Sequence, residues 1–135
     1  MIPESAPPSA RGELRALSAT LIAGAVYDAV FAFLFVAAPS LVASPLGLPL
    51  PGAGFYGKLI AVLLTIVAAV YLVAARDPER SRPLVVIAIG GRLLGFAVLA
   101  GSTLGHPELG GLWAPALVDL GFGVAHLVTG RRLLA

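Results

Sequence analysis

Three ionisable residues lie inside segments that are otherwise apolar enough to cross a lipid bilayer. They are Asp28, Arg92 and Asp119, in the first, third and fourth of four such segments. A charge near the bilayer centre costs roughly 2.5–3.5 kcal/mol on insertion scales, so residues of this kind normally face the protein interior and pair with one another. A guanidinium can hold two carboxylates through separate N–H groups, and we therefore expect Arg92 to bind Asp28, Asp119 or both.

This predicted cluster has two interpretations, and the sequence leaves both open. It can be structural, because a buried ion pair can decide which helices meet without doing any chemistry. It can also be functional, because one arginine and two aspartates leave one excess negative charge if all three are ionised. Excess charge is unfavourable away from water, so one carboxylate would then hold a proton, as proton relays and ion-coupled carriers require.

Three further polar side chains are candidate proton or ligand contacts, namely His126, Tyr27 and Lys58. We expect His126 to be a packed or hydrogen-bonded histidine in the fourth segment, with a role in proton movement as the alternative. Tyr27 is expected to be a packing aromatic, with a ligand contact as the alternative. Lys58 opens the second segment, where an ammonium group reaches the interface or attracts an anionic substrate or lipid head group.

No catalytic residue, metal site or cofactor is expected. The chain has no cysteine, which excludes disulfides, thiolate metal ligands and haem attachment through Cys-x-x-Cys-His. The second histidine, His106, lies in a predicted loop far from His126, so one chain does not supply a bis-histidine site. His-Glu-x-x-His, Gly-x-Ser-x-Gly and a phosphate-binding Gly-rich loop are absent from the sequence, and an enzyme is unsupported.

The elements that must position these residues are four apolar helices. Hydrophobic residues make up 59% of the 135 residues and charged residues 12%, against about 45–50% and about 25% in soluble domains. A span needs about 20 mostly apolar residues, and such runs cover about residues 17–38, 57–75, 83–101 and 112–130. The predicted fold class is all-α, an integral membrane four-helix up-down-up-down bundle over residues 17–132, with the lipid bilayer around it.

The basic residues outside these spans predict the orientation of the bundle. Lys58 lies on one side, and the arginines on the other side are Arg11, Arg15, Arg76, Arg80, Arg82, Arg131 and Arg132. The positive-inside rule therefore places both termini in the cytoplasm. These arginines flank the spans, so the net charge of +2 is explained by the orientation of the helices in the membrane. No nucleic acid partner is therefore expected. Residues 1–16 are predicted to form a disordered cytoplasmic tail.

Small residues accompany the charged residues on the predicted helices. They are Gly24 on the first helix, Gly91 and Gly95 on the third, and Gly123 on the fourth, each one turn or less from a charged residue. Small residues at this spacing allow close helix contact in lipid. We therefore expect the helices to approach one another closely around the cluster.

The whole arrangement resembles the small four-helix bacterial membrane proteins of the DoxX-like group. The resemblance covers about residues 17–132 and lies in the loop from Leu46 to Pro51, the helix end from Tyr71 to Pro78, and the pair Gly91-Arg92. It implies location in a bacterial inner membrane. Members of the wider group have been linked to redox-associated membrane complexes, but no catalytic motif carries over to this chain residue by residue.

These observations favour a non-enzymatic integral membrane protein, an accessory or interaction subunit whose Asp-Arg-Asp cluster organises helix packing. The first alternative is a small proton- or solute-coupled carrier, with Asp28 and Asp119 as acid groups and Arg92 setting their affinity. The second alternative is the redox-associated membrane subunit that the resemblance implies. Four helices enclose only a narrow lumen, so transport would require a homo-oligomer. The partners expected besides lipid are further copies of the chain in a homo-oligomer, or a larger membrane complex.

Overall fold

The computed structural model describes residues 8–48 and 54–135. All regular structure in these two ranges is helical, and neither range contains a strand. The elements in chain order are α1 (Pro8–Ala37), α2 (Pro39–Ala43), α3 (Phe55–Arg76), α4 (Arg82–Gly105), the 3₁₀-helix η1 (Pro107–Leu112) and α5 (Trp113–Leu134). The helices α1, α3 and α4, and α5 together with η1, are long and apolar enough to cross a membrane.

Proline and glycine set several of the helix ends. Pro39 and Pro83 lie in the first turns of α2 and α4, where a proline costs little because the first amides of a helix have no intrahelical partner. Gly54, directly before α3, has a φ of 59°, in the left-handed region that glycine adopts without steric penalty. Pro39 and Gly54 fall at the two ends of the predicted loop between the first two spans, and residues 49–53 of this loop lie outside the described ranges.

Helix α1 begins at Pro8, within the segment that the sequence predicts to be a disordered tail. That prediction is wrong for the described part of the segment, and residues 1–7 lie outside it. In this part of the helix Leu14 and Leu17 are buried, and Glu13 forms ion pairs with Arg131 at 3.4 Å and with Arg132 at 3.0 Å. These contacts join the start of α1 to the end of α5, which a local sequence pattern does not reveal.

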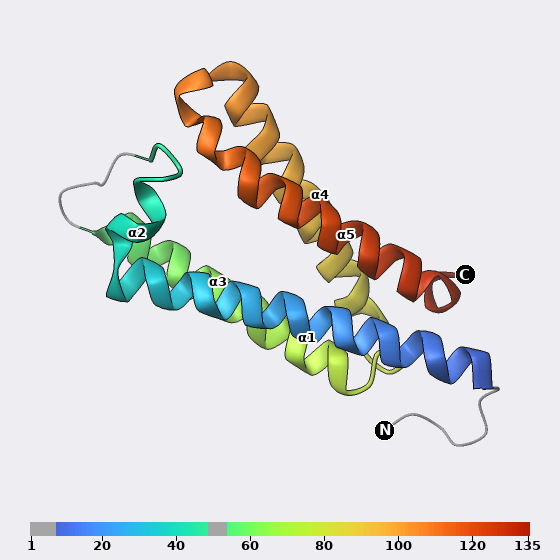
Figure 1. Cartoon of the computed structure of the whole chain (residues 1–135). Helices are drawn as coiled ribbons and strands as arrows, with labels where there is room; N and C mark the ends of the chain where they lie inside the picture. Colours follow the sequence, from blue (N-terminus) through green and yellow to red (C-terminus); the bar gives the residue numbers. More distant parts are fainter. Residues whose placement is uncertain (1–7, 49–53) are drawn as a thin grey trace.

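The four long helices associate as two pairs. Helix α1 packs mainly along α3, and α4 mainly along α5, while α1 also contacts α5 and α3 contacts α4 less extensively. Figure 1 shows the two pairs close together over the first part of α1 and diverging toward α2. The two ends of the molecule are therefore packed differently.

The hydrophobic core fills the end of the molecule at which α1 begins. Its buried members include Leu17 and Leu21 of α1, Ala74 of α3, and Val85 and Ala88 of α4. These side chains come from the start of α1, the second half of α3 and the first half of α4. The main core cluster thus lies toward this end, and a few smaller buried residues, such as Val42, Ala43 and Leu112, lie toward the other.

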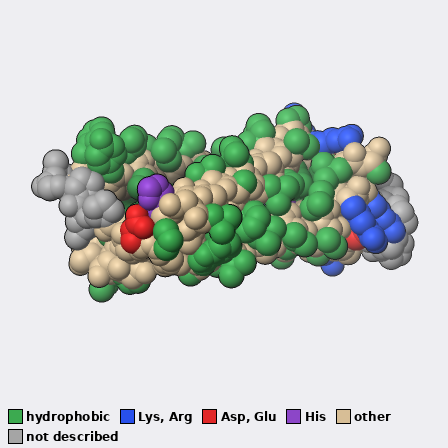
Figure 2. All heavy atoms as spheres, turned by 90° about the horizontal axis from the view of Figure 1, so that it is seen from above, with side chains coloured by type: hydrophobic (Ala, Val, Ile, Leu, Met, Phe, Trp, Pro, Cys, Tyr) green, Lys and Arg blue, Asp and Glu red, His purple; other side chains and the backbone are tan. Residues whose placement is uncertain are grey.

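Apolar side chains also cover the outside of the long helices. Phe33, Leu94 and Leu104 expose 68%, 65% and 75% of their surface, and the face seen in Figure 2 is largely hydrophobic over its middle. Lys and Arg side chains on this face gather toward one end. An apolar surface of this extent is unusual for a protein in water and suits contact with lipid.

Candidate functional site

The candidate site is built around the guanidinium of Arg92 on α4. Nη2 donates a hydrogen bond to Oδ2 of Asp28 on α1 at 2.8 Å, and Nη1 donates to Oδ1 of Asp119 on α5 at 2.6 Å. Nη2 also donates to the backbone carbonyl oxygen of Gly24 at 3.2 Å. The structure therefore brings together the three charged residues that the sequence singled out, with Arg92 bound to both acids. We call Asp28, Arg92 and Asp119 the ionic cluster.

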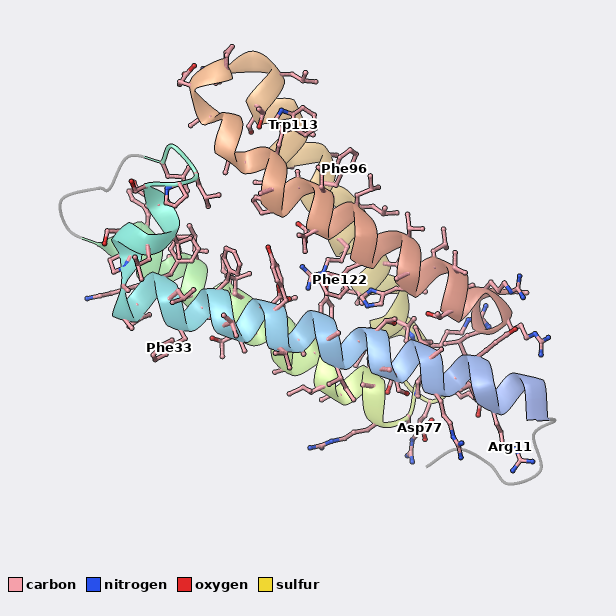
Figure 3. The ribbon with its side chains drawn as sticks, viewed as in Figure 1. Arg11, Phe33, Asp77, Phe96, Trp113 and Phe122 are labelled. Atoms are coloured by element: carbon pink, nitrogen blue, oxygen red, sulfur yellow. The ribbon has the colours of Figure 1, made fainter. Side chains whose placement is uncertain are left out.

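Three aromatic rings surround the guanidinium. Its Cζ atom lies 5.0 Å from the ring centroids of Tyr71 and Phe122 and 5.6 Å from that of Tyr27, within the range of about 6 Å for a cation–π contact. Figure 3 shows Phe122 between α5 and α1. Tyr71 belongs to α3, so Arg92 has a contact on each of the other three long helices. The rings help to bury the guanidinium, whose side chain is 6% exposed, and burial strengthens its ion pairs.

Two glycines allow helix backbones to come close to the ionic cluster. A Cβ atom on Gly24 would lie 3.2 Å from Nη2 of Arg92, and a Cβ atom on Gly95 would collide with the carboxylate of Asp119. Gly91 is different, because a Cβ atom there would meet nothing within 4 Å. Of the two glycines that flank Arg92 on α4, only Gly95 is therefore needed for a close contact.

The ionic cluster keeps unused hydrogen-bonding capacity. Oδ1 of Asp28 and Nε of Arg92 are buried and have no hydrogen-bond partner among the described residues. Arg92 reaches Asp119 through Oδ1 alone. Burying an unpaired polar atom costs about 1–3 kcal/mol. The cluster has one excess negative charge if all three residues are ionised, and one carboxylate oxygen is unpaired. The cluster can therefore bind a proton or accept a hydrogen bond from another group.

A cavity of about 350 Å³ lies directly against the ionic cluster. Asp28, Arg92 and Asp119 line one part of it, and most of the remaining wall is apolar, with contributions from α1, α3, α4, η1, α5 and the turn after α2. Phe35 and Leu99 are examples of this wall. The volume is at the lower end of the range, about 300–1,000 Å³, that is typical of small-molecule sites.

The ionic cluster lies between the main core cluster and the cavity. Along α1, the core residue Leu21 precedes Asp28, and the cavity residue Phe35 follows it. Along α4, the core residue Ile89 precedes Arg92, and the cavity residue Leu99 follows it. The cavity therefore reaches the cluster from the α2 side, and the core closes the opposite side.

His126 lies next to the ionic cluster but does not line the cavity. It is fully buried, stacks on Phe122 at a centroid distance of 5.9 Å, and meets Tyr71 edge-on at 5.9 Å. The backbone of Thr20 faces the ring, yet neither ring nitrogen completes a hydrogen bond with a described residue. His126 is thus packed between two aromatic rings, with the Thr20 backbone as the polar group that faces it.

The other two polar candidates, Tyr27 and Lys58, lie in different places. Tyr27 lines the cavity and packs against Phe31, with ring centroids 4.7 Å apart. Lys58 is exposed and lines a different groove, between α1 and α3, together with Phe33. Tyr27 therefore belongs to the site around Arg92, whereas Lys58 does not.

Sequence reasoning missed Phe122 and the cavity. Phe122 follows Asp119 by three residues and precedes His126 by four. Residues at this spacing share one face of a helix, so the sequence could have placed Phe122 beside the cluster. The cavity had no such signal, because it arises where the two helix pairs diverge. The angle between helices depends on tertiary packing and not on a local pattern.

No group of three His, Cys, Asp or Glu side chains comes together at metal-binding distance within the described ranges. Comparison with known proteins identifies no relative, since no protein-family model, curated protein or solved structure matches the chain. The geometry of the ionic cluster and of its cavity therefore carries the functional interpretation.

Proposed function

We propose that the chain is an integral membrane protein with four spans in up-down-up-down order, both termini in the cytoplasm, in a bacterial inner membrane. The apolar surface of the long helices supports insertion. Glu13 near the start of α1 pairs with Arg131 and Arg132 at the end of α5, which supports both termini at one side. Arginines gather at that side, whereas the opposite side has Lys58, and this asymmetry supports the cytoplasm as the location of the termini.

Within this protein the ionic cluster acts as a non-enzymatic clamp between the two helix pairs. The observation that carries this proposal is that one guanidinium binds Asp28 in the α1–α3 pair and Asp119 in its own α4–α5 pair. Beyond the cluster the pairs diverge around the cavity, so the clamp acts where apolar packing ends. A protein of this kind is an accessory or interaction subunit, whose packing the cluster organises.

The test is the stability of variants in a mild detergent. Replacing Arg92 by Leu leaves two buried carboxylates without a cation, and breaking a buried ion pair in this way costs about 3–5 kcal/mol. Replacing Asp28, Arg92 and Asp119 together by Leu removes every buried charge and should restore part of the lost stability. Arg15→Leu, at an exposed position of α1, is the matched control and should change the stability little.

Two results would contradict the clamp. One is an Arg92→Leu variant as stable as Arg15→Leu, which would mean that the ion pairs contribute nothing. The other is a triple variant that is less stable than Arg92→Leu. That result would mean that Asp28 and Asp119 stabilise the protein even without the arginine. Circular dichroism at each temperature reports whether the variants keep their helices.

A second candidate function is a small proton- or solute-coupled carrier. It is favoured by the unpaired Oδ1 of Asp28 and by a cavity that reaches the ionic cluster from one side while the core closes the other. A carrier would give pH-driven flux in liposomes, and Asp28→Asn would abolish this flux in a protein that stays folded. Absence of flux over a broad panel of solutes and pH gradients would exclude it.

Partners form the last part of the proposal. The resemblance to the DoxX-like group suggests a redox-associated membrane complex, and a homo-oligomer is the simpler assembly. Affinity purification from the native membrane, followed by identification of the co-purifying proteins, separates the two. Oxidoreductase subunits in the eluate would support the redox-associated complex, and a single protein species at a multiple of the chain mass would support the homo-oligomer.

A further inference from the structure

The cavity beside the ionic cluster has an unusual combination of surfaces. Its wall is mostly apolar and partly aromatic, with Phe31 and Phe35 from α1 and Leu99 from α4. The polar groups that line it include the members of the ionic cluster, and among these Asp119 is the most accessible, with 15% of its side chain exposed against 1% for Asp28. A molecule in the cavity would therefore meet hydrocarbon on its sides and the Asp119 carboxylate at its inner end.

The chemistry of that inner end disfavours an anion. The two terminal nitrogens of Arg92 already donate to Asp28, Asp119 and the Gly24 carbonyl oxygen, and the unpaired Nε is buried, so the positive charge of the guanidinium is already shared between two carboxylates. The ionised cluster carries one excess negative charge. The buried Oδ1 of Asp28 has no partner among the described residues. The polar end thus attracts a positive charge and accepts hydrogen bonds.

From these surfaces we infer that the cavity binds a lipophilic amine, a molecule with one ammonium group and a compact apolar body. The ammonium group donates to the Asp119 carboxylate and neutralises the excess charge of the cluster, while the apolar body lies along Phe31, Phe35 and Leu99. This inference rests on the proposed clamp, because it requires Arg92 to remain occupied by both acids. It does not require transport.

The test uses three probes that share one apolar body and differ in the polar group. These are 4-phenylbutylamine, 4-phenylbutanol and 4-phenylbutyrate, titrated into the full chain in nanodiscs of zwitterionic phosphatidylcholine, with empty nanodiscs as the reference. We expect saturable binding of the amine about tenfold tighter than that of the alcohol, since a charge-assisted hydrogen bond is stronger than a neutral one. The butyrate should show no saturable binding.

Two variants assign the binding to the cavity. Asp119→Asn removes the charge and should lower the affinity for the amine to that for the alcohol. Leu99→Trp fills the cavity and should weaken both probes at least tenfold. Val98→Trp places the same ring at a neighbouring position of α4 that is 57% exposed, and it should bind the amine like the wild type.

Several results would overturn the inference. They are butyrate binding as tightly as the amine, equal affinities for amine and alcohol, no saturable binding above that of empty nanodiscs, or Leu99→Trp binding like Val98→Trp. Each can occur while Arg92→Leu still destabilises the protein, so failure of this inference is distinguishable from failure of the clamp. If Asp119→Asn does not fold, the probe series on the wild type and the tryptophan pair still decide.

Discussion

Gly24 of α1 and Arg92 of α4 are in direct contact. The carbonyl oxygen of Gly24 accepts a hydrogen bond from Nη2 of Arg92 at 3.2 Å, and a Cβ atom on Gly24 would lie 3.2 Å from the same nitrogen and 3.3 Å from the Tyr71 ring. The missing side chain thus lets the backbone of α1 help to bind the guanidinium. Close backbone approach of this kind is what small residues provide between membrane helices.

A large side chain at Gly24 should therefore destabilise the protein. We expect Gly24→Leu to lower the free energy of unfolding in detergent by about 1–3 kcal/mol, the usual cost of overpacking. The matched control is Gly90→Leu on α4, where a Cβ atom would meet nothing within 4 Å, and this variant should keep or slightly raise the stability. Equal stability of the two variants would show that α1 does not contact Arg92 closely.

The glycines that flank Arg92 provide a second pair of variants. Gly95→Ala places a methyl group against the Asp119 carboxylate, whereas Gly91→Ala adds one in open space. We expect Gly95→Ala to cost about 1–3 kcal/mol and Gly91→Ala to be neutral or stabilising, because alanine favours a helix more than glycine does. Thermal unfolding in detergent measures both. If Gly91→Ala were the less stable of the two variants, Gly91 and not Gly95 would face α5.

The general class of the fold followed from composition and hydropathy, because few soluble proteins can hide so many apolar residues. The pairing of Arg92 with acids followed from the cost of an isolated charge in lipid, which leaves few arrangements for the three residues. The start of α1 did not follow, because Glu13 is held by Arg131 and Arg132 from the far end of the chain. Local composition, rich in proline and serine, indicated a tail instead.

The finer geometry of the site depends on how the helices are tilted and turned against one another. The spacing of Gly91 and Gly95 suggested that both mediate close contact, but only Gly95 faces Asp119 in the structure. The cavity depends on the divergence of the α1–α3 pair from the α4–α5 pair, which many side chains decide together. No single motif in the sequence encodes either feature.

The contribution of the buried His126 imidazole to stability can be measured by replacing it with an apolar side chain. Both of its ring nitrogens are buried without a hydrogen-bond partner among the described residues, so the imidazole gives little stability beyond its packing against Phe122 and Tyr71. We expect His126→Leu to keep or raise the stability, by up to about 1–3 kcal/mol, the cost of an unpaired buried polar group. A comparable loss in detergent unfolding would show that the ring makes a polar contact in the membrane.

The proposed orientation can be measured without removing native thiols, because the chain has no cysteine. Single cysteines at Glu79, in the turn between α3 and α4, and at Glu108, in η1, mark the two proposed sides. In intact bacterial spheroplasts a membrane-impermeant maleimide should label Glu108→Cys, and Glu79→Cys only after permeabilisation. The opposite labelling pattern would invert the topology, and labelling of both in intact spheroplasts would exclude four complete spans.

The most direct measurement of the clamp is the distance between the Arg92 guanidinium and each aspartate in a lipid bilayer. Magic-angle-spinning NMR of protein with nitrogen-15 arginine and carbon-13 aspartate measures it by dipolar recoupling, and Arg92→Lys, Asp28→Asn and Asp119→Asn assign the signals. We expect the Arg92 side-chain nitrogens to be coupled to the carboxyl carbons of both Asp28 and Asp119, consistent with hydrogen bonds of 2.8 Å and 2.6 Å. Absence of coupling to Asp28 in the bilayer would contradict the clamp, because Asp119 belongs to the same helix pair as Arg92.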